Sequence, residues 1–236
     1  MQKRVFFQNR RGETIVPVAG STENGAAVCR GEGAIRLTDL IEGDVILLRG
    51  RRFQSACVAA VCGGVSHIGI MVNFGGQLFF VESVSYRSAL TEPLAMGPGA
   101  KKGGVCGVTL PSVLPFYSSS AVFRVTPPFT KDELTTIRAE VLRVYGCRYE
   151  GRLLRMANSI FSIRKAPPPA TRFHCGQLVA HLLKLTNRFN ETGALGPKKC
   201  FSGDLTPLDV VSSINCRCLG RLDGTAPLRC SSAGAR

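Results

Sequence analysis

The sequence lacks several features that would place the chain in a common functional class. No run of apolar residues approaches the roughly 20 that a membrane-spanning helix needs, which argues against an integral membrane protein. Tryptophan is absent and aromatic residues make up only 7%. Because the basic residues are scattered rather than interleaved with aromatics, the pattern is not that of a nucleic-acid binder. We therefore do not expect nucleic acid as the partner.

The composition is that of one globular domain with appendages. Of the 236 residues, 44% are hydrophobic and 19% are charged, with 30 Lys and Arg against 16 Asp and Glu, a formal net charge of +14. Such a surface attracts anions, including acidic substrates and anionic membrane surfaces. The first residues, MQKRVFFQNRR, are basic, but a short apolar stretch and Glu13 do not fit an export signal. We expect a cytoplasmic protein, with peripheral attachment to a membrane as the alternative.

Cysteine is unusually frequent. The ten cysteines stand at positions 29, 57, 62, 106, 147, 175, 200, 216, 218 and 230. A chain of this length and core content does not need a disulfide scaffold, so reduced thiols are expected. The close pairs, Cys57 with Cys62 and Cys216 with Cys218, do not match the spacing of zinc-binding pairs. The sequence thus predicts neither a metal site nor a cofactor.

The order of patterns along the chain predicts three parts. Residues 1–36 are polar and Gly-rich and indicate a loose N-terminal extension. Residues 37–214 carry the strand and helix patterns of a folded domain. Residues 215–236 are basic and rich in Cys and Gly, without a core pattern, and predict a flexible tail.

Helix signals within the domain are local and clear. Thr130 to Glu133 form a capping box before residues at helical spacing, and Gly146 ends that pattern. Thr206, followed by Pro207, predicts the start of a short helix. Residues 151–165 are basic and amphipathic, which favours a helix covering the core, with a membrane-surface helix as the alternative.

Ser66–Ser83 has the signature of a β-hairpin. Two β-rich runs flank Asn73-Phe74-Gly75-Gly76. If all four residues form the loop, His67 lies directly opposite Glu82, at a distance that lets a carboxylate reach an imidazole nitrogen. A two-residue Gly-Gly turn would instead pair His67 with Val84 and leave Glu82 on the diagonal, in looser contact.

Cys175 stands at the start of an apolar helix pattern, in "RFHCGQLVAHLLKLTN". A helix N-terminus and a nearby imidazolium both favour the reactive thiolate. The first-turn N–H groups of Cys175 and Gly176 could hold the oxygen of an attacked carbonyl, and a glycine lets a substrate approach the backbone closely. The alternative is a small buried filler, because buried cysteines are common.

His67 is the histidine best placed to act on Cys175. It begins a strand, and Glu82 on the return strand could fix its tautomer and stabilise the imidazolium. His174 precedes the thiol directly and is expected to point elsewhere, whereas His181 is interpreted as surface or packing. The alternative is a purely structural role, with a histidine in the core beside a glutamate at the end of a strand.

Four segments in the same order carry a resemblance to a known superfamily. "EGDVILL", "SHIGIMV", "FFVES" and "FHCGQLVAHLL" resemble the circularly permuted NlpC/P60 (papain-like) thiol hydrolases. "VESVSYRSALTEPL", a helix and then "YGCRY" are most similar to the YiiX/YebB-like and poxvirus branch. Many relatives carry Ser and Glu after the thiol, where this chain has Gly176 and Gln177.

The resemblance implies an α+β fold, in which a small antiparallel sheet packs against helices with the nucleophile at a helix N-terminus. It also implies Cys175 as nucleophile, His67 as base and Glu82 as orienting group, with Tyr149 lining the site. The activity would be hydrolysis or acyl transfer at an amide, ester or thioester of a peptide, lipid or lipidated protein, in the host cytoplasm if the chain is viral. The alternatives are a non-catalytic lipid- or protein-binding module and a His-acid-Cys deubiquitinating-like protease. The oligomeric state is not predicted.

Overall fold

A mostly antiparallel sheet organises the part of the chain that the computed structural model describes, namely residues 15–17, 26–28, 34–51, 59, 64–85, 103–149, 172–190 and 205–227. Its strands follow the order β3 (Ala34–Ile35), β11 (Cys216–Leu222), β8 (Tyr117–Val125), β4 (Val45–Gly50), β5 (His67–Phe74), β6 (Gln77–Val84) and β7 (Gly104–Val108). Pairs from β11 to β7 are antiparallel. By contrast, β3 joins β11 and β12 (Ala226–Pro227) joins β8 in parallel.

Two small strand pairs and several helices complete the described elements. β1 (Ile15–Pro17) pairs with β2 (Ala26–Val28), and β9 (Arg148–Tyr149) pairs in parallel with β10 (Arg172–Phe173). The helices are η1 (Leu37–Asp39), α2 (Leu110–Val113), η3 (Leu114–Phe116), α3 (Lys131–Val144), α5 (Cys175–Leu185) and α7 (Pro207–Ser212). The fold is therefore α+β, as expected. None of the helices described is long and apolar enough to cross a membrane.

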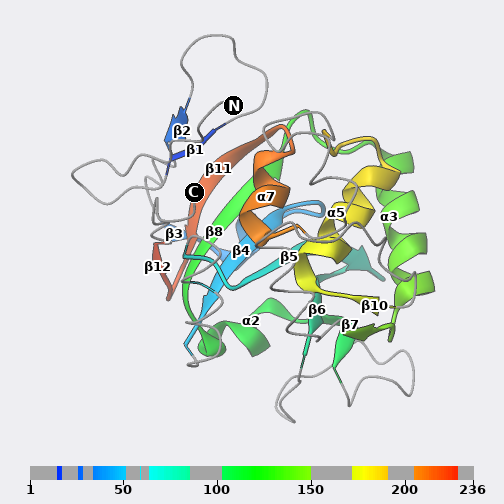
Figure 1. Ribbon diagram of the computed structural model, residues 1–236, viewed down its shortest axis with the longest axis horizontal. Coiled ribbons are helices and arrows are strands. Elements are labelled where there is room, and N and C mark those ends of the chain that lie inside the picture. The colour runs from blue at the N-terminus through cyan, green and yellow to red at the C-terminus, as the bar shows by residue number, and fades with distance from the viewer. Residues whose placement is uncertain are drawn as a thin grey trace, which may run out of the picture.

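The two faces of the sheet bury separate apolar cores. Alternate residues of β4 point to opposite sides, so Val45 and Leu47 join one core and Ile46 and Leu48 the other. The first core is covered by α3, α5 and α7, which lie on the same side of the sheet (Figure 1). The second core is completed by residues of α2. This arrangement fixes where α5, and the cysteine at its first position, lies against β5 and β6.

The three longer helices start where the local sequence predicts. At α3 the Thr130 hydroxyl accepts from the Glu133 N–H and the Glu133 carboxylate accepts in return, so the predicted capping box is confirmed. At α7 Thr206 and Asp209 make the same reciprocal pair ahead of the apolar turn. α5 begins at Cys175, as expected.

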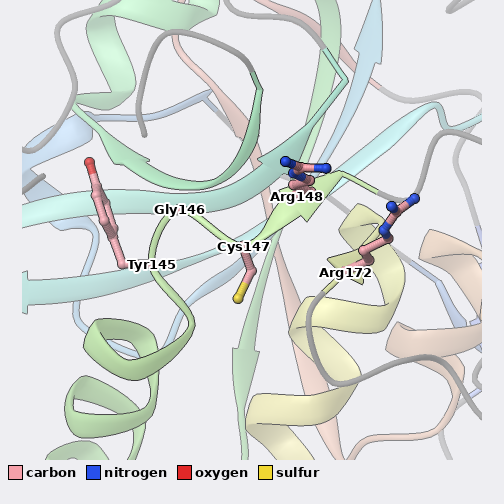
Figure 2. A pocket seen from close by; sticks show the side chains of 5 residues that line it. All are labelled: Tyr145, Gly146, Cys147, Arg148 and Arg172. Carbon is pink, nitrogen blue, oxygen red and sulfur yellow. The ribbon is translucent and has the colours of Figure 1, made fainter. Parts of the chain in front are cut away.

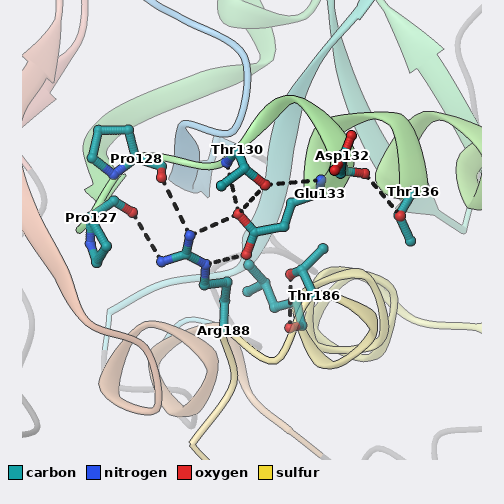
Figure 3. Close-up of polar contacts among 9 residues, drawn as sticks. Pro127, Pro128, Thr130, Asp132, Glu133, Thr136, Thr186 and Arg188 are labelled. Atoms are coloured by element: carbon teal, nitrogen blue, oxygen red, sulfur yellow. Dashed lines mark hydrogen bonds and ion pairs between the residues drawn. The ribbon is translucent and has the colours of Figure 1, made fainter.

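Arg188 joins the start of α3 to the chain that follows α5. Its Nε and Nη2 bind the two carboxylate oxygens of Glu133 at 2.6 and 2.8 Å, and its remaining N–H groups donate to the carbonyls of Pro127 and Pro128 (Figure 3). The Glu133 carboxylate also accepts from Thr130. This bidentate contact ties together α3 and α5, two of the three helices that pack over the first core.

The prediction of a flexible tail from residue 215 is wrong for residues 216–227. β11 pairs with β8 inside the central sheet, and β12 pairs with the other end of β8. Cys216, Gly220 and Leu222 of β11 are buried and Arg217 is exposed, so its inward positions include the small residues Cys and Gly. The predicted amphipathic helix over residues 151–165 lies outside the described residues.

The cysteines do not share one oxidation state. Cys218 is disulfide-bonded, so the expectation of reduced thiols throughout is wrong for this residue. Cys106, Cys147, Cys175 and Cys216 are not in disulfide bonds. The residue singled out as a nucleophile therefore carries a thiol in the folded chain.

Candidate active site

The hairpin of β5 and β6 turns through two residues. Phe74 pairs with Gln77, and both Gly75 and Gly76 have positive φ, as a type I′ turn requires. The favoured four-residue loop is therefore wrong and the Gly-Gly alternative is right. The turn places Glu82 opposite Gly69, on the diagonal from His67.

The diagonal contact between His67 and Glu82 is nevertheless tight. His67 Nε2 and Glu82 Oε2 are 2.6 Å apart, with both side chains buried. Gly69 has no side chain to stand between them, and the ring of Phe80 lies over it, since a Cβ at Gly69 would come within 2.4 Å of that ring. A long carboxylate side chain can span the diagonal when the position opposite is empty. The predicted looseness of this register is therefore wrong.

Tyr117, the first residue of β8, holds the plane of the imidazole. Its ring stacks on that of His67 at 5.8 Å between centroids and 13° between planes. Burial, followed by the negative charges of Glu82 and Cys175, raises the pKa of Tyr117 well above its usual value, so the phenol keeps its proton. Nothing in the sequence pattern around Tyr117 pointed to the site, because its position depends on the pairing of β8 with β4.

Cys175 is brought to this pair by the short strand that precedes α5. The Ser83 hydroxyl, next to Glu82 on β6, donates to the carbonyl of Phe173 at 2.7 Å. This bond ties the segment two residues ahead of Cys175 to the strand that carries the carboxylate. The Cys175 thiol lies close enough to the imidazole of His67 for each group to shift the pKa of the other. Because Nε2 of His67 is engaged by Glu82, Nδ1 is the ring nitrogen available to the sulfur.

The thiol and the imidazole shift each other's pKa in opposite directions. Burial disfavours the charged form of both groups. For Cys175, polar contacts with His174 and His67 outweigh burial and lower the pKa below that of a free thiol. For His67, contacts with Cys175 and Glu82 outweigh burial and raise the pKa. Both shifts favour the form in which the sulfur is a thiolate and the imidazole is protonated.

His174 is a second imidazole beside the thiol, contrary to the expectation that it points elsewhere. Its Nδ1 accepts from the Gln177 N–H at 3.3 Å, and Gln177 Oε1 accepts from the His174 N–H at 3.1 Å, so the residue caps α5. Its other ring nitrogen, Nε2, is buried and has no hydrogen-bond partner in the part of the chain that the structure describes. The cap explains how a residue adjacent to Cys175 can fold back over the first turn of the helix.

The backbone of Leu205 leaves no room for a side chain at Gly176. A Cβ at this position would lie 2.1 Å from the carbonyl oxygen of Leu205. Packing by itself is therefore sufficient reason for a glycine here, and the expectation that it opens the backbone to a substrate stays a prediction. The N–H of Gly176, in the first turn of α5, still lacks an intrahelical acceptor.

Two further residues considered in the sequence, Tyr149 and His181, have identified neighbours. Tyr149 on β9 pairs with Phe173 on β10, two residues before Cys175. His181 lies on the body of α5 and bonds Glu140 of α3 at 2.5 Å, and its ring packs against Phe173 at 5.4 Å, so it has the packing role expected. Within the described ranges, no cluster of three or more His, Cys, Asp or Glu could hold a metal ion.

Comparison with known proteins adds a weak structural likeness. The chain matches no protein-family model and no curated protein sequence. Among solved structures, it is similar to the crystal structure of the metalloprotein YiiX, of the DUF1105 group, from Escherichia coli O157:H7. The match has a TM-score of 0.48 and 15% sequence identity, and it covers 76% of this chain and 96% of that one.

Proposed function

We propose that the chain is a cysteine-dependent hydrolase or acyltransferase of the permuted papain-like type, acting on an amide, ester or thioester bond. One observation carries the proposal: His67 binds the buried carboxylate of Glu82 at 2.6 Å and lies within electrostatic reach of the Cys175 thiol, at the first residue of α5. A nucleophile, a base and a group that orients the base are the components of acyl-transfer catalysis. Their order along the chain, His67, Glu82 and Cys175, is that of the permuted family the sequence resembles.

The first half of the reaction forms an acyl-enzyme. The Cys175 thiolate attacks the carbonyl carbon of the substrate, and the carbonyl π-electron pair moves onto oxygen. The N–H groups of Cys175 and Gly176 lie in the first turn of α5 and supply donors for that oxyanion. When the oxyanion collapses, the bond to the leaving group breaks, and the His67 imidazolium gives its proton to that group. A thioester on Cys175 and a neutral His67 remain.

The second half returns the enzyme to its starting state. His67 takes a proton from water, or from another acceptor, whose oxygen attacks the thioester carbonyl. Collapse of this second oxyanion expels the Cys175 thiolate and releases the acid or the new acyl product. The imidazolium that results is stabilised by Glu82 and again faces the thiolate. Substrates of this chemistry include peptides, lipids and lipidated proteins.

The proposal is tested first without a substrate. The full chain is treated with a limiting amount of iodoacetamide at pH 7, and labelling of each cysteine peptide is followed by mass spectrometry. We expect Cys175 to react fastest and this preference to disappear in His67→Ala. Slow labelling of Cys175 at the rate of the other free thiols, with no effect of His67→Ala, would contradict the proposal and favour a non-catalytic binding module.

A substrate screen then tests turnover. Peptide amides, p-nitrophenyl acyl esters and acyl thioesters are incubated with the full chain and with Cys175→Ala. We expect one class to be cleaved with a transient acyl adduct on Cys175, and Cys175→Ala to be inactive while its circular dichroism spectrum is unchanged. Equal turnover by both proteins would exclude Cys175 as the nucleophile.

A further inference from the structure

A pocket of about 450 Å³ lies beside the strand that leads to Cys175. Tyr145, Gly146, Cys147, Arg148 and Arg172 line it (Figure 2). Its volume is within the range of small-ligand sites. The pocket is distinct from the surroundings of the His67 imidazole, because neither Glu82 nor Tyr117, which contact that ring, lines the pocket.

The two arginines of the pocket stand directly beside one another. β9 and β10 are parallel, and Arg148 is the register partner of Arg172. Register partners project from the same face of a strand pair, with strands about 4.8 Å apart. Figure 2 shows the two side chains next to each other at one side of the pocket. Like charges in this position repel, and an anion between them would remove the repulsion.

Neither arginine is neutralised within the described part of the chain. Other arginines are paired: two nitrogens of each guanidinium donate to one carboxylate in Arg124, Arg138 and Arg188. The side chains of Arg148 and Arg172, by contrast, form no hydrogen bond or ion pair with any residue of that part.

The backbone beneath the arginines is held rigidly. The Gly146 N–H donates to the Val105 carbonyl at 3.0 Å, and the Val105 N–H donates to the Cys147 carbonyl at 2.9 Å. Two of the lining residues, Gly146 and Cys147, are thus tied to β7 of the central sheet. A Cβ added at Gly146 would meet no atom within 4 Å, so this side of the pocket is open. A rigid floor lowers the cost of ordering the two guanidinium groups around a ligand.

We propose that Arg148 and Arg172 form a binding site for a phosphate group. A planar guanidinium presents paired donors that match the oxygens of a phosphate, and two of them balance a dianion. Arg172 is three residues before Cys175, so their Cα atoms are at most about 11 Å apart. Resting on the proposed function, the site would hold the phosphate of a substrate whose acyl group reaches Cys175.

The test measures phosphate binding directly and so does not depend on catalysis. Inorganic phosphate and glycerol 3-phosphate are titrated into the full chain at constant ionic strength by calorimetry. We expect saturable binding that weakens by about tenfold or more in Arg148→Gln and in Arg172→Gln. Arg217→Gln is the matched control, because Arg217 is exposed on β11, outside the pocket, and loses the same charge. Its affinity should equal that of the parent chain.

A second arm distinguishes the source of the phosphate. Vesicles of phosphatidylcholine with and without phosphatidic acid are sedimented with each variant. Binding to phosphatidic acid that falls in Arg148→Gln but not in Arg217→Gln identifies a lipid headgroup, whereas binding of glycerol 3-phosphate alone identifies a soluble phosphoester. No saturable phosphate binding, or an equal loss in all three variants, would overturn the proposal. Since Cys175→Ala should bind phosphate like the parent chain, an inactive thiol would leave this result intact.

Discussion

His67 Nε2 lies 2.6 Å from Glu82 Oε2, along the diagonal of the β5–β6 pair. Because this contact engages Nε2, it leaves Nδ1 as the ring nitrogen available to the sulfur of Cys175. It also stabilises the positive charge that the imidazole carries beside the thiolate. The proposed site thus combines side chains from β5, β6 and α5.

The carboxylate can be tested by an isosteric change. In Glu82→Gln the amide still fills the space but no longer stabilises the imidazolium, so the pKa of His67 should fall. We expect turnover of the substrate class identified by the screen to drop on the order of 10²-fold or more. Glu140→Gln is the control, because Glu140 bonds His181 away from the thiol. Equal turnover in Glu82→Gln and Glu140→Gln would show that Glu82 has no orienting role.

The lowered pKa of Cys175 predicts an unusual pH profile of alkylation. A thiolate exists above its pKa, so labelling of Cys175 should persist well below the usual thiol range near pH 8.5. Cys147 is the internal control, since burial raises its pKa and it should label only at alkaline pH. The measurement is the rate for each peptide between pH 4 and pH 10. A shared midpoint for the two cysteines would contradict the thiolate assignment.

His174 has two roles that two substitutions can separate. Asn is a good helix N-cap and keeps an acceptor for the Gln177 N–H, whereas Ala removes it. Both changes remove the second imidazole, so both should raise the pH midpoint of Cys175 alkylation. Only His174→Ala should also lose about 1 kcal/mol of unfolding free energy, seen as a Tm lower by a few degrees. If neither variant moved the midpoint, His174 would be a cap alone.

Local signals predicted the helices of this fold well. Reciprocal capping pairs such as Thr130 with Glu133 involve residues three apart, so the sequence contains the whole interaction. The same holds for the start of α5 at Cys175. Strand assignments were weaker where the inward side chains are small: β11 buries Cys216 and Gly220, and neither residue type indicates a strand.

Contacts between distant segments were harder to predict. The hairpin sequence is compatible with two registers. They differ in whether Asn73 and Phe74 belong to the loop or, as observed, to β5. Tyr117 reaches the site only because β8 pairs with β4, which pairs with β5. The stacked phenol was therefore missed, whereas the His67 and Glu82 pair was identified because both lie on one hairpin.

Gly176 should not tolerate a side chain. In Gly176→Ala the new Cβ would lie 2.1 Å from the Leu205 carbonyl oxygen, and backbone cannot move aside as a flexible side chain can. Overpacking of this kind costs about 1–3 kcal/mol, which lowers the Tm of a chain of this size by several degrees. Thermal unfolding of Gly176→Ala, compared with Cys175→Ala in the same turn, checks this. An unchanged Tm would mean that the two segments separate freely.

The contact between Arg188 and Glu133 should make stability depend on acid. Hydrogen bonding to Arg188 lowers the pKa of Glu133 to about 2, below the value of about 4.3 in an unfolded chain. A carboxylate with a depressed folded pKa contributes its stability above the unfolded pKa and loses it as pH falls toward 2. Arg188→Gln should therefore cost on the order of 1 kcal/mol at pH 7 and less at pH 3.

Urea unfolding of both proteins at pH 7 and pH 3 measures this difference. Arg36→Gln is the control, because Arg36 and Asp39 form an exposed pair whose loss should have little effect at either pH. A cost for Arg188→Gln that is the same at pH 3 as at pH 7 would show that Arg188 stabilises the fold through the carbonyls of Pro127 and Pro128 instead. The charge on Glu133 would then contribute nothing to holding α3 beside α5.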